Sequence, residues 1–144
     1  MIQIRTLLES KGFDIWSVHP ESTVYDALKM MAEKDIGALL VIEQGEVRGI
    51  FSERDYARKV ILKGKNSQET PVNDIMTPAV IYLRIDQSVE ECMEVMTTHH
   101  IGHLPILEEN KLIGIISIGD VVKAVIADQE FMIDQLESYI RQER

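Results

Sequence analysis

A serine followed three residues later by an aspartate occurs twice in this sequence, each time at the end of an apolar segment. The first pair is Ser52 and Asp55, and the second is Ser117 and Asp120. A strand that ends at such a serine and leads into a helix exposes free backbone N–H groups and a positive dipole end, which favour a phosphate. An aspartate one turn later can accept both hydroxyl groups of a ribose. The pairs therefore predict sites for a phosphorylated nucleoside.

The same spacing is also typical of a capping box. In that motif the serine hydroxyl accepts a hydrogen bond from the third helical N–H, and the acidic side chain accepts one from the serine N–H. This structural interpretation carries about as much weight as ligand binding at each junction. The two are compatible, because one helix end can be capped and also bind a ligand.

Arg54 precedes Asp55 and adds a charge-assisted contact for a phosphate group. It belongs to a basic cluster in a protein of net charge −9, formed by Arg54, Arg58, Lys59, Lys63 and Lys65. The cluster is either a solvated helix face or part of a pocket for a small anion. The second junction has Gly119 in place of the arginine, so its predicted phosphate affinity is weaker.

The two junctions belong to an internal repeat. At an offset of 65 residues and without a gap, residues 15–61 are identical to residues 80–126 at 12 of 47 positions. Twelve of the other 35 positions exchange one apolar residue for another. Two copies of one supersecondary unit are therefore expected, and they should share a core, because about 50 residues can hardly bury their own apolar face.

Each copy contains the same predicted elements in the same order. A short apolar strand, at 15–18 or 80–83, precedes a helix whose apolar residues recur at i, i+3, i+4 and i+7. Two strands joined by a turn follow, and a second helix begins at the serine. The pattern predicts an α/β fold of the α+β kind, in which two β-α-β-β-α repeats pack about a pseudo-twofold axis with clefts between them.

Helical extensions are predicted on both sides of the repeats. The expected boundaries are an N-terminal helix at 1–11, a first repeat at 12–64, a linker at 65–79, a second repeat at 80–127 and a C-terminal helix at 128–144. The last helix carries apolar residues at Phe131, Ile133, Leu136, Tyr139 and Ile140. Packing on the core and a dimer contact explain this helix about equally well.

The repeat resembles a tandem pair of CBS domains, the Bateman module, over residues 12 to about 128. The resemblance rests on the two G-I-[FI]-S-x-x-D ends, the G-H-L-P-I strand at 102–106 and the D-I-M-T-P linker at 74–78. It implies a compact, often homodimeric signal-transduction module. The clefts of this family commonly bind AMP, ADP, ATP, NAD or S-adenosylmethionine.

The resemblance also implies roles for individual residues of the first site. The aspartate binds ribose and the serine binds phosphate, and each cleft is built from both repeats. The Asp55 cleft is then completed by Thr77 and Ile81 at the adenine and by His103 near the phosphate.

The second site is implied to draw on the segment before the first repeat. The Asp120 cleft is then completed by Gly12, Asp14 and Trp16. The first copy has Ala38 at the position that His103 occupies in the second copy. The Asp120 cleft is therefore expected to lack both a histidine and an arginine.

Catalytic and metal-binding functions find little support in the sequence. His99 and His103 have a spacing that binds zinc on a helix, but the helix should end near His100, so no metal is expected. The sequence contains no Walker, GxSxG or GxGxxG motif, and no acidic pair stands out as a general acid and base. We therefore expect a protein that is not an enzyme.

Net charge, apolar runs and cysteine content limit the kinds of partner and the cellular compartment that are expected. The acidic net charge argues against a nucleic-acid partner, and no stretch approaches the ~20 apolar residues of a membrane span. The N-terminus lacks the apolar run of a signal peptide, and the single Cys92 permits no internal disulfide. A cytoplasmic location is expected.

The leading hypothesis is a regulatory sensor. An adenine nucleotide bridges the repeats and favours one of two arrangements, which a separate, unidentified protein detects. The main alternative is a protein-interaction or dimerisation module that uses the tail helix and has vestigial nucleotide sites. A nucleotide hydrolase is the third hypothesis.

Overall fold

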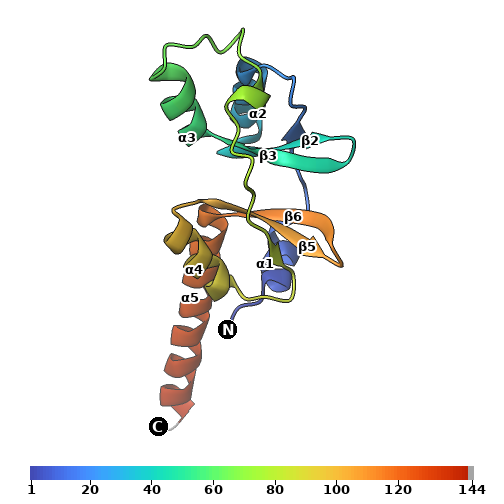
Figure 1. The fold of residues 1–144 in the computed structure, drawn as a ribbon. Helices are drawn as coiled ribbons and strands as arrows, with labels where there is room; N and C mark the ends of the chain where they lie inside the picture. The colour runs from blue at the N-terminus through green and yellow to red at the C-terminus, as the bar shows by residue number, and fades with distance from the viewer. Residues whose placement is uncertain (143–144) are drawn as a thin grey trace. The chain divides into compact units, whose positions relative to one another are not determined.

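The computed structural model describes residues 1–142 and divides into two compact units (Figure 1). The first-repeat unit comprises residues 15–80. The second-repeat unit comprises residues 1–14 together with residues 81–142. The N-terminal segment, which leads into the first repeat, thus belongs to the unit of the second.

The first-repeat unit is a three-stranded sheet with helices. Its elements are β1 (Ser17–Val18), α2 (Val24–Lys34), β2 (Ala38–Glu43), β3 (Glu46–Ser52), α3 (Glu53–Asp55), the π-helix η1 (Tyr56–Ile61) and the 3₁₀-helix η2 (Val72–Asp74). The strand order is β1-β2-β3, with β1 parallel and β3 antiparallel to β2.

The second-repeat unit has the same sheet topology and an additional N-terminal helix. Its elements are α1 (Ile4–Lys11), β4 (Leu83–Arg84), α4 (Val89–His99), β5 (His103–Glu108), β6 (Lys111–Ser117) and α5 (Ile118–Gln142). The strand order is β4-β5-β6, again with one parallel and one antiparallel pair. The predicted α+β class, with two β-α-β-β-α repeats, is confirmed.

Side-chain caps and left-handed residues set the ends of α2 and α4. The Thr23 hydroxyl accepts from the N–H of Asp26, and the Ser88 hydroxyl accepts from the N–H of Glu91. Both helices end at a residue with φ of 54°, which are Asp35 and His100. The two copies therefore start and stop their first helix by the same chemistry.

Each unit has its own hydrophobic core, so the expectation that the two copies share one core is wrong. In the first-repeat unit the buried face of α2 packs with residues of β2 and β3, among them Leu39, Val41 and Phe51. In the second-repeat unit the buried face of α4 packs with β5, β6 and α1. Cys92 lies in this second core, and burial raises the pKa of its thiol to about 12, so the thiol stays protonated at neutral pH.

The helix after each serine differs between the copies. A regular helix was expected from Ser52, but only α3 is α-helical before the chain widens into the π-helix η1. From Ser117 onward the backbone instead continues as the long α-helix α5. No helix among the described residues is long and apolar enough to cross a membrane.

Candidate functional site

The junction between β3 and α3 forms a complete capping box. The Ser52 Oγ accepts from the Asp55 N–H at 3.2 Å, and Asp55 Oδ2 accepts from the Ser52 N–H at 3.0 Å. The predicted capping interpretation is therefore confirmed at this junction. The box also fixes the Asp55 carboxylate in place at the start of the helix.

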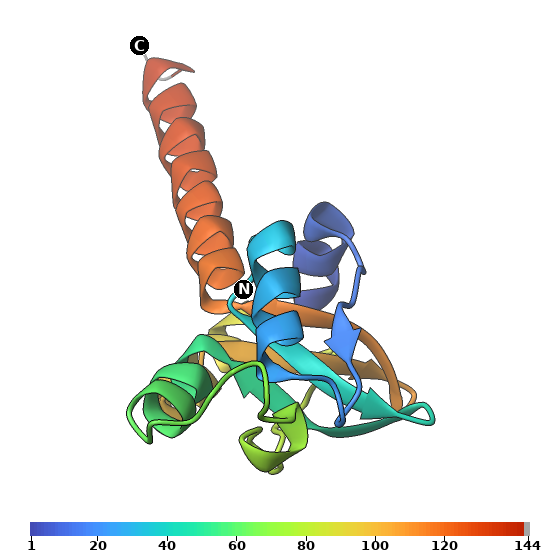
Figure 2. The same ribbon diagram turned by 90° about the horizontal axis from the view of Figure 1, so that it is seen from above.

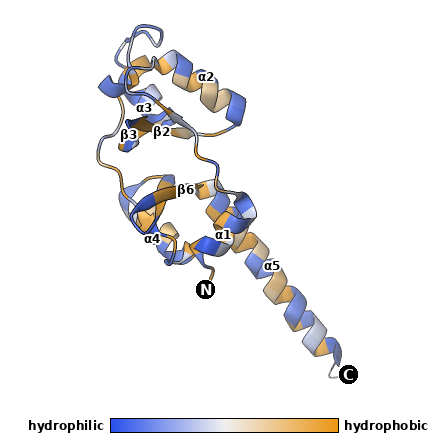
Figure 3. Cartoon of the chain, turned by 90° about the vertical axis from the view of Figure 1, so that its right-hand side faces the viewer, coloured by the Kyte–Doolittle hydropathy of each residue, from blue (hydrophilic) through white to orange (hydrophobic). Residues whose placement is uncertain are grey.

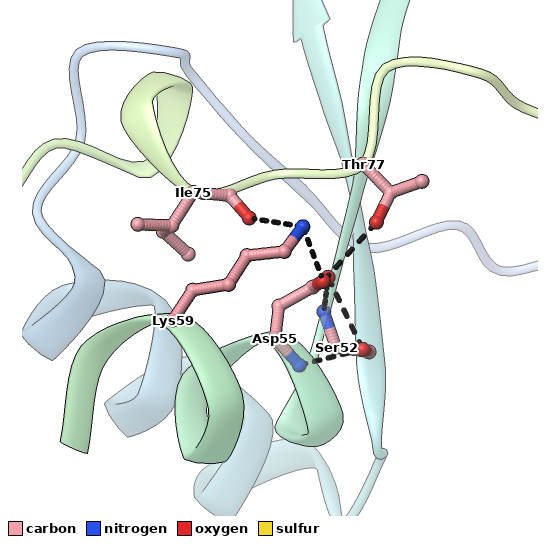
Figure 4. Close-up of polar contacts among 5 residues, drawn as sticks. All are labelled: Ser52, Asp55, Lys59, Ile75 and Thr77. Atoms are coloured by element: carbon pink, nitrogen blue, oxygen red, sulfur yellow. Dashed lines mark hydrogen bonds and ion pairs between the residues drawn. The ribbon is translucent and has the colours of Figure 1, made fainter. Parts of the chain in front are cut away.

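The second carboxylate oxygen of Asp55 has partners from two other segments (Figure 4). Oδ1 accepts from the Thr77 hydroxyl at 3.1 Å and lies 3.0 Å from the Lys59 ammonium. Oδ2 also accepts from the Ser52 hydroxyl at 3.2 Å. Asp55 is only 6% exposed. These four hydrogen-bond donors therefore fill the acceptor positions of the Asp55 carboxylate, of which there are about four.

Lys59 is a site residue that the sequence analysis assigned only to the basic cluster. It lies one turn after Asp55, on η1, and its ammonium also donates to the Ile75 carbonyl at 3.2 Å. An aspartate followed four residues later by a lysine is a spacing that places both on one helix face. This spacing is the feature of the sequence from which the Asp55–Lys59 pair could have been predicted.

Thr77 reaches Asp55 because its own backbone is paired with the edge strand β3. The N–H and C=O of Ile50 exchange hydrogen bonds of 2.9 and 2.8 Å with Thr77. A Cβ at the neighbouring Gly49 would lie 2.7 Å from the Thr77 carbonyl oxygen. Glycine at position 49 therefore permits the approach that brings the Thr77 hydroxyl to the carboxylate.

The junction between β6 and α5 repeats the capping geometry. Asp120 Oδ2 accepts from the Ser117 N–H at 2.8 Å, and the Ser117 Oγ accepts from the Asp120 N–H at 3.1 Å. The second carboxylate therefore occupies the same position relative to its strand and helix as the first.

A lysine from another element again pairs with this carboxylate. Lys11, the last residue of α1, places its ammonium 2.6 Å from Asp120 Oδ2 and also donates to the Ile115 carbonyl. Burial tends to raise the pKa of Asp120, but the hydrogen bonds from Lys11 and Ser117 and the charge of Lys11 outweigh it, so the pKa is lowered.

His103 lies at the start of β5, directly opposite Ser117 in the sheet register. Its pKa is lowered by burial and by the charge of Lys11, while Asp120 opposes the shift. The Asp120 site was expected to lack a histidine, yet His103 and Lys11 both lie within electrostatic reach of Asp120. The predicted role of His103 at the Asp55 phosphate stays a prediction.

The remaining predicted residues are distributed over both units. Gly12 ends α1 with a φ of 108°, and Asp14 is exposed in the segment after it. Trp16 belongs to the first-repeat unit, where the Lys34 ammonium lies 4.0 Å from its ring centroid. Ile81 packs on the core of the second-repeat unit. Arg54 is exposed on α3.

Two further observations concern residues outside these junctions. A cavity of about 290 Å³ in the second-repeat unit is lined by residues that include Arg5, Arg84 and Glu108, but by none of the predicted site residues. Among residues 1–142, no group of three or more His, Cys, Asp or Glu residues is arranged to hold a metal ion.

The sequence matches known proteins over most of its length. The CBS-domain family model matches residues 10–62 and 72–127. The chain is 38% identical to the mitochondrial CBS domain-containing protein CBSX3 of Arabidopsis thaliana, covering 96% of this chain and 71% of the relative. It is 33% identical to CBS domain-containing protein YhcV of Bacillus subtilis, covering 73% and 74%.

Solved structures show the same fold. A protein with CBS domains from Burkholderia ambifaria is 51% identical, with a TM-score of 0.85 over 88% of this chain and 96% of that one. The CBS domain pair of protein MJ0100, solved with 5′-methylthioadenosine and S-adenosyl-L-methionine, is 20% identical with a TM-score of 0.78, covering 89% and 98%. Together with the family match, these likenesses establish that the chain belongs to the CBS-domain family and carries two CBS repeats.

Proposed function

We propose that this protein is a regulatory module that binds an adenosine-containing ligand, such as AMP, ADP, ATP or NAD, at the Asp55 and Asp120 junctions. The ribose hydroxyls bind the aspartate, and the phosphate binds at the helix start with help from the nearby lysine. The role is to sense the ligand and not to transform it.

The observation that carries the proposal is the repeated placement of a capped aspartate. In each copy the carboxylate is fixed at the start of a helix by the serine before it. A fixed carboxylate with two oxygens matches the two neighbouring hydroxyls of a ribose. The adjacent helix start favours an anion.

Binding at Asp55 requires an exchange of partners, because its acceptor positions are occupied by the chain itself. The Lys59 side chain is 43% exposed, so its ammonium can move from Asp55 to an incoming phosphate. This movement frees Oδ1 for a ribose hydroxyl and keeps the lysine charge paired. Lys11, 31% exposed, performs the same exchange at Asp120.

The comparisons support the choice of ligand class. The two molecules named with the MJ0100 domain pair both contain adenosine and lack a phosphate. Their shared part is the one that the aspartates are proposed to bind. The phosphate contact is inferred from the lysines of this chain.

A thermal-shift panel with AMP, ADP, ATP, NAD and S-adenosylmethionine tests the proposal. A ligand at about 100 times its dissociation constant adds ~2.7 kcal/mol to the free energy of unfolding, which raises the Tm by several degrees. Asp55→Asn and Asp120→Asn should each remove the shift that arises at its own site.

Glu53→Gln is the matched control, since it removes one negative charge from the same turn of α3 without touching the capping box. This variant should keep the full shift. A panel in which no adenosine ligand raises the Tm of the wild type would contradict the proposal. Equal shifts for the wild type and the Asp55→Asn, Asp120→Asn double variant would do so as well.

The proposal also includes a homodimer, an unidentified regulated protein and a cytoplasmic location. A mitochondrial relative shows that members of the family are found in other compartments. Fractionation of the source cells, followed by detection of the tagged full chain, tests the location.

A further inference from the structure

The segment that forms η1 and the loop after it is basic. Residues 56–68 contain Arg58, Lys59, Lys63 and Lys65 and no aspartate or glutamate, in a chain of net charge −9. The residues 65 positions later, 121–133, contain one lysine and two acidic residues. The basic segment is therefore particular to the first repeat, and the fold that the two repeats share does not require it.

The end of η1 and the start of the loop form a turn at residues 61–65, here called the tip. In Figure 1 this part of the chain lies on the side of the helices away from β2 and β3, and Figure 2 shows the same segment from above. The Gly64 N–H donates to the Ile61 carbonyl at 3.1 Å, and the Lys65 N–H donates to the Val60 carbonyl at 2.9 Å. Gly64 has a φ of 68°, which suits this tight turn. Backbone hydrogen bonds therefore fix the shape of the tip.

Two large apolar side chains of the tip are exposed. Ile61 is 56% exposed and Leu62 is 76% exposed, whereas Val60 beside them is fully buried in the core. A single exposed apolar side chain is common and needs no explanation. Here two are adjacent, and Figure 3 shows that the loop after them is hydrophilic. The apolar pair is thus an isolated protrusion within a polar surface.

Three cations flank the apolar pair. Arg58, Lys63 and Lys65 are exposed, and none of them forms an ion pair with any residue in the range 1–142. Lys59, by contrast, is bound to Asp55 and to the Ile75 carbonyl. The basic cluster predicted from the sequence therefore divides, because Lys59 belongs to the Asp55 junction while these three cations remain available to an anion outside the chain.

We propose that the tip, together with Arg58, binds an anionic lipid surface. The three cations lie at the level of the lipid headgroups, where basic side chains are attracted to negative charge. Ile61 and Leu62 enter the boundary between headgroups and acyl chains, as the apolar residues of interfacial segments do. The lysine side chains are long enough to keep their ammonium groups in water above the inserted pair. Such contact with a membrane surface needs no spanning helix.

The placement of the apolar pair favours lipid over a protein groove. A helix that docks in a groove presents anchors at i, i+3 or i+4, and i+7 along one face. Ile61 and Leu62 are instead adjacent at the end of a helix, which suits shallow insertion into a fluid surface. The acidic net charge of the chain opposes this approach only weakly, because charges more than about 8 Å apart are largely screened at physiological salt.

Co-sedimentation of the ligand-free full chain with lipid vesicles tests the proposal. The wild type should bind vesicles of phosphatidylcholine that contain about one third phosphatidylserine, and should bind pure phosphatidylcholine many-fold more weakly. Lys63→Gln should weaken binding by about fivefold, which corresponds to the loss of one cation near the surface. Leu62→Ser should weaken it by about tenfold, because a polar side chain gains nothing from insertion.

Lys29→Gln is the matched control, since it removes one exposed lysine from α2 of the same unit. This variant should bind like the wild type, and all variants should keep the wild-type Tm, because the altered side chains are exposed. Equal losses for Lys63→Gln and Lys29→Gln would overturn the proposal. Capture of the wild type by immobilised polyglutamate, without binding to either vesicle, would overturn it as well. Because no nucleotide is present and Lys59 is unchanged, the outcome is independent of the sensor proposal.

Discussion

Each of the two aspartates is paired with a lysine, but the two lysines come from different parts of the chain. Lys59 reaches Asp55 from the next helical turn, whereas Lys11 reaches Asp120 from the helix before the first repeat. At the repeat offset, Lys59 aligns with Ala124. The two copies thus obtain a lysine–aspartate ion pair from non-equivalent positions.

The exchange of Lys59 between carboxylate and phosphate has a direct test. Lys59→Met removes the competitor at Asp55 and also removes the phosphate contact. We therefore expect the affinity for AMP to fall relative to the affinity for adenosine, by about tenfold for the loss of one charged hydrogen bond. Titration calorimetry with both ligands measures the ratio. Equal changes for both ligands would show that Lys59 does not contact the phosphate.

The lowered pKa of Asp120 makes its stabilisation pH-dependent. Because the folded pKa lies below the ~3.9 of an unfolded aspartate, the stabilisation is complete above that value. It is lost as the pH falls through the folded pKa. Lys11→Met should lower the free energy of unfolding by ~1 kcal/mol at pH 7, with a difference that shrinks below about pH 4. Urea unfolding from pH 7 to pH 3 measures this, and a constant difference would contradict it.

At the scale of elements, a close backbone approach positions the first site. A Cβ at Gly49 would meet a backbone oxygen at 2.7 Å, whereas a Cβ at the equivalent Gly114 would meet the end of the Leu8 side chain at 3.0 Å. The edge of β3 cannot move away without breaking its pairing with Thr77. A side-chain end can rotate instead.

This difference predicts unequal effects of the same substitution. Gly49→Ala should destabilise the protein by about 1–3 kcal/mol through overpacking, and Gly114→Ala by clearly less. Gly49→Ala should also weaken AMP binding at the Asp55 site, because it displaces Thr77. Urea unfolding of both variants provides the comparison, and a larger loss for Gly114→Ala would refute this explanation.

The elements and the capped aspartates could be predicted from the sequence, because apolar periodicity and the serine–aspartate spacing are local signals. The serine of each pair holds the backbone N–H of its aspartate as the spacing predicts. The π-helix η1 could not be predicted from the same signals, since the apolar pattern of residues 56–61 fits an ordinary helix.

Local sequence patterns also do not predict that Lys11 pairs with Asp120. Lys11 and Asp120 are far apart in the chain, and they meet only because α1 packs in the unit of the second repeat. The family resemblance pointed to Gly12 and Asp14 in this segment but gave no reason to select the lysine beside them. Tertiary packing decides which side chain of the segment reaches the carboxylate.

At the scale of the whole molecule, the two CBS repeats carry two related but unequal serine–aspartate junctions. The first has Lys59 and the exposed Arg54 near its aspartate, and the second has Lys11 and His103. A ligand bound at each junction would therefore meet a different set of polar and charged groups.

The most direct test of the account is the role of the ribose hydroxyls. Titration calorimetry of the wild-type protein should compare AMP with its 2′-deoxy and 3′-deoxy forms. Because each missing hydroxyl leaves a carboxylate oxygen without its donor, both analogues should bind at least about tenfold more weakly than AMP. If both deoxy analogues bind as tightly as AMP, the aspartates do not bind the ribose, and the central claim is wrong.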